Sequence, residues 1–171
     1  MLFWKKKTTA AAVPPPIPVT PPAPVEPVDD GAPRKKIMVV DDDPIILKTL
    51  SFTLQSKGFK VVTATDGSQA IGLMRDESPD MMLVDVTLPP DVGAGGVVPW
   101  DGFQVAQWIR RMNGRVPTIV ISGTDRPDYQ QRAKALGAEF FAKPINNDLL
   151  LASIASAIGE PQTATQTTVK A

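Results

Sequence analysis

Residues 37–44 read Ile-Met-Val-Val-Asp-Asp-Asp-Pro, and these eight residues indicate the fold class. Four consecutive apolar residues are typical of a strand that is buried on both faces of a sheet. The aspartates end the strand, and Pro44 is well placed as the first residue of a helix. Three leucines then recur at helical spacing between residues 47 and 54, until Lys57-Gly58 ends the helix. A buried strand followed directly by an amphipathic helix is the unit of a parallel α/β sheet.

The same unit recurs along the chain up to residue 159. Five strands alternating with five helices predict a parallel sheet covered by helices on both faces. The expected strands are residues 37–40, 61–62, 81–84, 118–121 and 139–142. The expected helices contain residues 47–54, 70–74, 103–109, 127–136 and 149–158, with Asp43 and Asp101 as N-caps of the first and third.

Composition excludes several kinds of chemistry. The chain has 171 residues but no cysteine and no histidine, so disulfides, Cys/His metal sites and His-dependent hydrolases are excluded. The net charge is zero, so no global attraction to nucleic acid or membrane is expected. That total hides a basic leader (1–36) and an acidic domain (37–159). Carboxylates, hydroxyls, lysine and arginine remain as reactive groups.

The domain is flanked by two segments of different composition. Residues 1–36 hold nine of the 18 prolines and predict an extended tether, and residues 160–171 predict a Thr/Gln-rich disordered tail. Met1-Leu2-Phe3-Trp4 precedes three lysines, and such a tip can touch an anionic membrane surface. The simpler interpretation is a solvated terminus. The apolar stretch is too short for a signal peptide or a membrane span.

Polar residues stand where the expected strands end, at Asp41-Asp42, Asp85, Ser122 and Lys143. The carboxyl ends of parallel strands share one edge, which is where such sheets bind ligands. Carboxylates that share a cleft repel one another unless a cation neutralises them, and Mg2+ is a hard cation that prefers oxygen ligands. One carboxylate can then attack a phosphoryl group, while Lys143 and Ser122 bind its oxygens. The set therefore suits formation of an aspartyl phosphate.

With these motifs in place, the chain resembles the response-regulator receiver domains of two-component signalling over about residues 35–159. The resemblance implies a flavodoxin-like, doubly wound (βα)5 fold with strand order 2-1-3-4-5. It rests on motifs that occur in order along the chain: Val39-Val40-Asp41-Asp42-Asp43-Pro44, Leu83-Val84-Asp85 with Leu88-Pro89, Asp101-Gly102-Phe103, Ile121-Ser122-Gly123, Ala135-Leu136-Gly137-Ala138 and Phe140-Phe141-Ala142-Lys143-Pro144.

The resemblance implies that Asp85 accepts a phosphoryl group from a histidine kinase or a phosphotransfer protein. It implies that Asp41 and Asp42 hold Mg2+ together with the Asp85 carboxylate and the backbone carbonyl of Thr87. No organic cofactor is expected. The protein would be a phosphoacceptor and not an enzyme in the ordinary sense, since it would catalyse only its own phosphorylation and dephosphorylation.

The resemblance also implies how the signal leaves the site. Ser122 would move toward the phosphoryl group, Lys143 would pair with it, and the rotamer of Phe140 would report the active state. The Lys143–Pro144 bond is expected to be cis. The output would be a protein contact on the face of the fourth helix, fifth strand and fifth helix. We expect a single-domain, cytoplasmic protein without an attached output domain, a nucleic-acid partner or a membrane span.

The chain departs from the family pattern between Asp85 and Asp101, which lie 16 positions apart. The excess is roughly nine residues within 90–100, and such lengthening costs little because closure entropy grows logarithmically with length. The simpler expectation is a mobile surface loop. The sharper hypothesis is an apolar lid or partner contact formed by Val97, Val98 and Trp100.

The same residues allow other interpretations. A pseudo-receiver scaffold would bind partners without phosphorylation, although the complete acidic set argues against it. A phosphohydrolase of the haloacid-dehalogenase type would need an aspartate where Thr87 stands. Phe141 is expected in the core, and Arg110-Arg111 on a solvated helix face. The glycines at 93, 95 and 96 lie in the wrong loop for a dinucleotide fingerprint.

Overall fold

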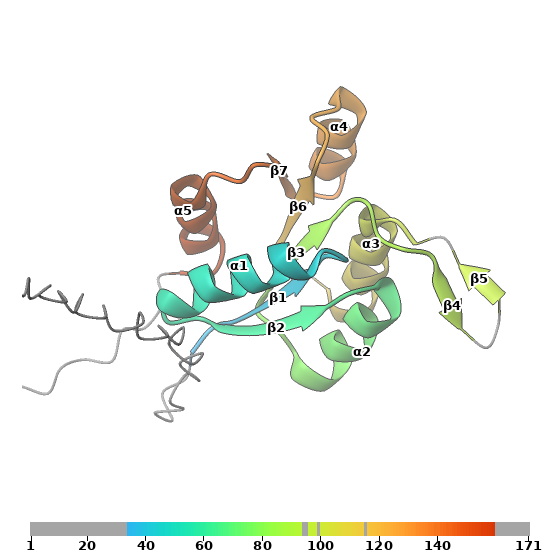
Figure 1. Cartoon of the computed structure of the whole chain (residues 1–171), viewed down its shortest axis with the longest axis horizontal. Helices are drawn as coiled ribbons and strands as arrows, with labels where there is room; N and C mark the ends of the chain where they lie inside the picture. The colour runs from blue at the N-terminus through green and yellow to red at the C-terminus, as the bar shows by residue number, and fades with distance from the viewer. Residues whose placement is uncertain (1–33, 94–95, 99, 115, 160–171) are drawn as a thin grey trace, which may run out of the picture.

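The computed structural model describes residues 34–93, 96–98, 100–114 and 116–159 of the chain (Figure 1). The predicted tether up to residue 33 and the predicted tail of residues 160–171 lie outside the described residues. Within the described part of the chain, no helix combines the length and apolar character that crossing a bilayer requires.

The core of the domain is a five-stranded sheet in which all strand pairs are parallel. The strand order is β2-β1-β3-β6-β7, which is the order 2-1-3-4-5 when these strands are counted along the chain. The predicted flavodoxin-like fold is therefore confirmed. The strands are β1 (Lys36–Val40), β2 (Lys60–Ala64), β3 (Met81–Asp85), β6 (Thr118–Ser122) and β7 (Glu139–Ala142).

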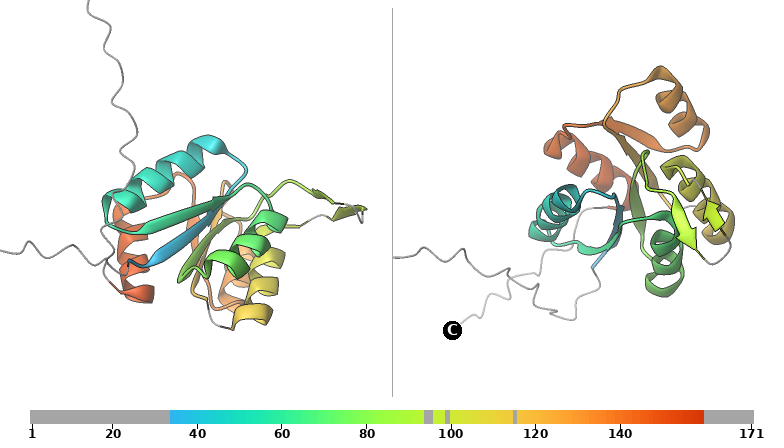
Figure 2. Two further views of the ribbon diagram at one scale, coloured as in Figure 1. Left: turned by 90° about the horizontal axis from the view of Figure 1, so that it is seen from below. Right: turned by 45° about the vertical axis from the view of Figure 1, so that its right-hand side comes forward.

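Helices cover both faces of this sheet, which therefore has two apolar layers (Figure 2). Residues of α1 and α5 pack with one face, and residues of α2, α3 and α4 pack with the other. Phe141 is partly buried in the first layer, as expected, and Phe140 is partly buried in the second. The helices are α1 (Pro44–Ser56), α2 (Gly67–Glu77), α3 (Gly102–Asn113), α4 (Pro127–Ala135) and α5 (Asn147–Ile158).

Short polar side chains start most of these helices. Asp43, Asp66, Asp101 and Asn146 each accept a hydrogen bond from a backbone N–H in the first turn of the helix that follows. The predicted N-caps Asp43 and Asp101 are thereby confirmed, and Asp101 forms a full capping box with Gln104. Because the helices start where the strands end, acidic side chains gather at the carboxyl edge of the sheet.

The insertion after β3 forms a β-hairpin, so the expectation of a plain surface loop is wrong. Strands β4 (Asp91–Gly93) and β5 (Gly96–Val98) pair antiparallel in a sheet of their own and project from the body (Figure 1). The base of the hairpin is anchored by Trp100, which packs on the core and meets Trp108 edge to face at 6.4 Å between ring centroids. Trp100 is thus a packing residue, and the lid hypothesis stays a prediction for Val97 and Val98.

Candidate functional site

Two aspartates end neighbouring strands in the middle of the sheet. Asp41 follows β1 directly and Asp85 is the last residue of β3, and the two strands are paired up to Val40 and Val84. Their exposed fractions are only 1% for Asp41 and 4% for Asp85. Two carboxylates this deeply buried require compensating partners, because an unpaired buried charge is costly.

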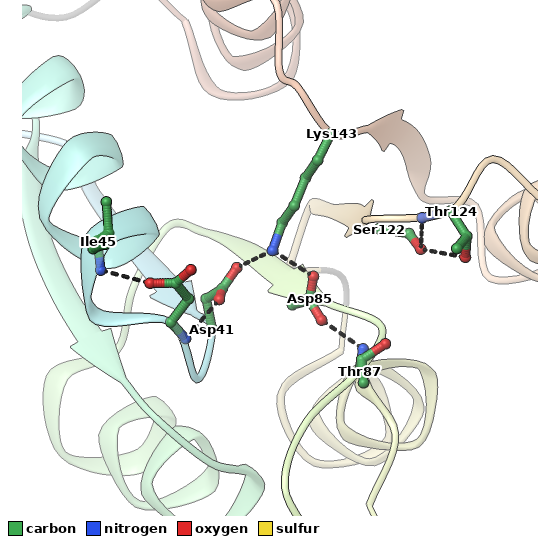
Figure 3. Close-up of polar contacts among 8 residues, drawn as sticks. Asp41, Ile45, Asp85, Thr87, Ser122, Thr124 and Lys143 are labelled. Carbon is green, nitrogen blue, oxygen red and sulfur yellow. Dashed lines mark hydrogen bonds and ion pairs between the residues drawn. The ribbon is translucent and has the colours of Figure 1, made fainter.

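Lys143 supplies the compensating charge (Figure 3). Its Nζ lies 2.7 Å from Asp41 Oδ2 and 2.8 Å from Asp85 Oδ1. The other oxygens accept from the backbone: Asp43 N–H donates to Asp41 Oδ1 at 2.9 Å, and Thr87 N–H donates to Asp85 Oδ2 at 2.6 Å. Every carboxylate oxygen of the two aspartates therefore has a donor, which fixes the orientation of both groups.

The buried setting shifts the pKa values of this group. Burial raises the pKa of Asp85, the contacts with Lys143 and the Thr87 amide offset only part of that rise, and the charge of Asp41 adds to it. Burial also lowers the pKa of Lys143, but the hydrogen bonds and charges of Asp41 and Asp85 outweigh it and leave the pKa of Lys143 raised. The ammonium therefore stays protonated at neutral pH.

Ser122 stands close to this triad but is turned to another partner. It is the last residue of β6, next to β3 in the sheet, and its exposed fraction is 1%. Its Oγ accepts from the Thr124 amide at 3.1 Å and lies 3.3 Å from Thr124 Oγ1 (Figure 3). Its carbonyl accepts from the Lys143 amide at 2.7 Å, which ties the ends of β6 and β7 together. The Lys143–Pro144 bond is cis, as expected.

The structure brings together Asp41, Asp85 and Lys143, while Asp42 and Thr87 are exposed at the rim. Among the described residues, no three His, Cys, Asp or Glu side chains are grouped as a metal cage. Mg2+ needs only one or two carboxylates plus water, so the buried Asp41–Asp85 pair is a suitable donor set. The assignment of Mg2+ ligands stays a prediction.

Two residues that sequence reasoning did not assign also shape the site. Thr124 holds the Ser122 hydroxyl: its amide donates to Ser122 Oγ two residues back, which is the local contact that a serine hydroxyl commonly makes in a turn. Gly102 belongs to the Asp101-Gly102-Phe103 motif, and the structure shows why it is glycine: a Cβ there would lie 1.9 Å from the Asp85 carbonyl oxygen. The start of α3 therefore packs directly on the backbone of Asp85.

The sheet and the residues at its carboxyl edge are together typical of one kind of signalling protein. A parallel sheet of order 2-1-3-4-5 with paired acids, a serine and a lysine at its carboxyl edge is that of a phosphoacceptor signalling module and not of a classical enzyme. The family model described as "Response regulator receiver domain" matches residues 37–155. The chain belongs to this family of two-component signalling proteins.

Similar proteins agree with this membership. The chain is 31% identical over 114 residues to the alkaline phosphatase synthesis transcriptional regulatory protein PhoP of Bacillus subtilis, covering 66% of this chain and 44% of PhoP. It is 30% identical over 118 residues to the transcriptional regulatory protein PrrA of Mycobacterium tuberculosis, covering 68% of this chain and 47% of PrrA. The chain thus spans about half the length of these curated relatives.

Among solved structures, the Vibrio cholerae chemotaxis protein CheY4 is similar with a TM-score of 0.63 and 28% identity. The match covers 72% of this chain and 98% of CheY4. The BeF3-activated receiver domain of Klebsiella pneumoniae RstA shares the fold, with a TM-score of 0.63 and 23% identity over 72% of this chain and 98% of that domain.

Proposed function

We propose that Asp85 accepts a phosphoryl group from a phosphohistidine of a histidine kinase or phosphotransfer protein. A carboxylate oxygen of Asp85 attacks the phosphorus, a P–O bond forms, and the N–P bond to the donor imidazole breaks with its electron pair. The observation that carries the proposal is the position of Asp85, buried at the end of a central strand with a lysine ammonium 2.8 Å from its Oδ1. A cation at that distance favours the charge that the transferred group brings.

The neighbouring groups have separate roles in this proposal. The Thr87 amide holds Asp85 Oδ2 and so fixes the carboxylate for attack. Lys143 neutralises the transferred oxygens, and Ser122 donates to one of them after leaving Thr124. Asp41, Asp42, the Asp85 carboxylate and the Thr87 carbonyl would hold Mg2+. That ion would supply a further positive charge beside the phosphoryl oxygens.

The switch in this proposal is the side chain of Ser122. In the structure its hydroxyl is engaged with Thr124, so binding a phosphoryl oxygen requires that contact to be exchanged. Phe140 lies in the neighbouring strand β7, where Val120 of β6 is its register partner. The movement would thereby bias the surface formed by α4, β7 and α5, which we propose binds the downstream protein.

A pseudo-receiver scaffold is the alternative, and one observation favours it. Lys143 pairs with both buried acids, and the backbone amides of Asp43 and Thr87 hold their other oxygens, so the hydrogen bonds of the two carboxylates are complete as they stand. The two functions differ in one measurable property, which is whether Asp85 becomes phosphorylated. The single-domain expectation stays a prediction, tested by the intact mass of the protein from its source cell.

The test is incubation of the full chain with acetyl phosphate and Mg2+, followed by intact mass spectrometry. We expect the mass gain of one phosphoryl group in wild type and none in Asp85→Asn, which is nearly isosteric. Asp43→Asn is the matched control, because asparagine caps a helix as well as aspartate does and the residue lies beside the same site. Absence of labelling in wild type would favour the scaffold, and labelling of Asp85→Asn would refute the assignment of Asp85 as the phosphoacceptor.

A further inference from the structure

Helix α4 is held to the rest of the domain by few apolar contacts. Ala133 is the only buried residue of this helix, and Tyr129 is partly buried. The N-cap residue of α4, Arg126, makes no side-chain capping bond, whereas the N-caps of α1, α2, α3 and α5 each make one. Figure 1 shows α4 at the outside of the fold. The position of α4 therefore depends strongly on its polar contacts.

One arginine of α4 reaches across to the start of α3. Arg132 Nη2 donates to Asp101 Oδ2 at 2.7 Å, and the Arg132 guanidinium carbon lies 4.0 Å from the centroid of the Phe103 ring. The Tyr129 ring, about one turn earlier on α4, also lies against Phe103, with 5.7 Å between the centroids. A planar guanidinium can bind a carboxylate and cover an aromatic face at once. We call the contact of Arg132 with Asp101 and Phe103 the α3–α4 latch.

The α3 side of the latch is fixed to the strand that carries the phosphoacceptor. Asp101 Oδ1 accepts from the Gln104 amide at 2.7 Å, as the N-cap of α3. The Gly102 amide donates to the Val86 carbonyl at 2.9 Å, and Gly102 lies directly against the Asp85 carbonyl. Because these contacts hold the start of α3 on the backbone of β3, that end of the latch stays in place when α4 moves.

The first turn of α4 is tied to the switch residue Ser122. The loop between β6 and α4 contains Thr124, whose amide holds the Ser122 hydroxyl at 3.1 Å. The same loop is bound to α4, because Gln130 Nε2 donates to Asp125 Oδ1 at 2.5 Å. A movement of Ser122 toward Asp85 therefore displaces the loop, and the loop displaces α4. The helix is thus connected to the phosphoacceptor site at two places, through this loop and through the latch.

We propose that Arg132 is a positioning residue that holds α4 in place and thereby opposes phosphorylation of Asp85. The latch is complete in the structure in which Thr124 holds Ser122, and displacement of α4 would pull Arg132 away from its partners on α3. The latch therefore favours the unmodified arrangement, and by reciprocity phosphorylation weakens the latch. This inference rests on the function proposed above for Asp85.

The exposure of the latch limits its strength. The exposed fractions of the Arg132 and Asp101 side chains are 43% and 35%, so water screens the ion pair. An exposed ion pair and a cation–π contact together shift a two-state equilibrium about fivefold. A surface ion pair with a purely structural role would stabilise both arrangements of α4 equally, and its loss would leave the phosphorylation rate unchanged. The phosphorylation rate therefore separates a positioning role from a structural one.

The test is the initial rate at which acetyl phosphate and Mg2+ label the full chain, followed by intact mass spectrometry. We expect Arg132→Gln to be labelled about two- to fivefold faster than wild type, because displacement of α4 no longer breaks the latch. Arg132→Lys keeps the charge but not the planar guanidinium, so its rate should lie between the two. Lys134→Gln is the matched control, because it removes the same charge from an exposed position of α4 outside the latch. Its rate should stay within about 1.5-fold of wild type.

Hydrogen exchange of the backbone amides of the unmodified chain gives a second readout that needs no phosphorylation. Arg132→Gln should speed exchange in α4 up to about fivefold and leave α5 unchanged, which also shows that the variant is folded. Labelling of Arg132→Gln less than about 1.5-fold faster than wild type, or unchanged exchange in α4, would overturn the role of the latch and leave Asp85 as the phosphoacceptor. Absence of labelling in wild type would instead refute both this inference and the proposed function.

Discussion

Replacing Gly102 with alanine should destabilise the domain by about 2–4 kcal/mol. The added Cβ would lie 1.9 Å from the Asp85 carbonyl oxygen and 2.8 Å from the Asp85 carbonyl carbon. Both are backbone atoms of the central strand β3, so no side-chain rotation can relieve the overlap. The backbone conformation of Gly102 lies outside the left-handed region, so the cost is steric and not conformational.

The magnitude follows from what must move. The start of α3 has to shift outward by about 1 Å, which strains the hydrogen bond from the Gly102 amide to the Val86 carbonyl, now 2.9 Å long. Losing a hydrogen bond of this kind costs about 1 kcal/mol, and the forced displacement of packed elements costs about 1–3 kcal/mol more. Because the clash falls on the carbonyl of Asp85 itself, phosphorylation by acetyl phosphate should slow as well.

Urea denaturation of the full chain, followed by circular dichroism, measures this effect. Gly72→Ala is the matched control, because a Cβ at Gly72 on α2 would meet nothing within 4 Å. It should stabilise the protein by about 0.5–1 kcal/mol, as expected for alanine in a helix interior. If Gly102→Ala unfolded within about 0.5 kcal/mol of wild type, the close approach of α3 to Asp85 would be refuted.

Three further changes test the packing and charges. Trp100→Ala should lower the free energy of unfolding, measured by urea denaturation, by about 2–3 kcal/mol, because the ring packs on the core. An unchanged urea midpoint would mean that Trp100 does not anchor the base of the hairpin. Lys143→Met should lower the free energy of unfolding by about 3 kcal/mol without Mg2+, because two buried acids lose their cation, and added Mg2+ should restore part of that stability. A stability that does not respond to Mg2+ would contradict the predicted ligand set. Burial raises the pKa of Asp80, but the Lys36 amide and the Lys35 ammonium outweigh burial and leave the pKa below its usual value. The Asp80 carboxylate therefore stabilises the fold above about pH 4, and this contribution is lost as the pH falls through the lowered pKa. Asp80→Asn should therefore cost up to about 1 kcal/mol at pH 7 and less as the pH falls through the lowered pKa, and a loss that did not change with pH would exclude the charge as its cause.

The fold was predictable because its signals are local. Each buried strand is a short apolar run, as in Ile37–Val40, and each is followed by a helical pattern with its own cap or stop. The carboxyl ends of parallel strands lie at the same edge of a sheet, so residues that follow the strands are expected together there. These residues are Asp41, Asp85, Ser122 and Lys143. Those positions depend on topology alone, which the pattern determines.

The hairpin and the polar contacts were not predictable in the same way. Valines flank a glycine-rich stretch between residues 92 and 98, but the apolar runs on either side are only one and two residues long, which makes a weak hairpin signal. The contact of the Ser122 hydroxyl with Thr124 spans only two residues, but whether the hydroxyl forms it depends on a side-chain rotation that the residue pattern does not determine. The sequence pattern predicts which residues lie at the carboxyl edge of the sheet, whereas the contacts among them depend on their charges and side-chain rotamers.

This choice of contacts explains how the proposed modification would act on the fold. Lys143 now divides its charge between Asp41 and Asp85, and Ser122 is held by Thr124, so the unmodified site is satisfied without either switch residue moving. A phosphoryl group on Asp85 would replace one buried negative charge by about two, placed farther out from β3. Lys143 and Ser122 would then have a stronger acceptor than their present partners. Since Lys143 follows β7 and Ser122 ends β6, the two responses would fall on adjacent strands and would favour the same rearranged state.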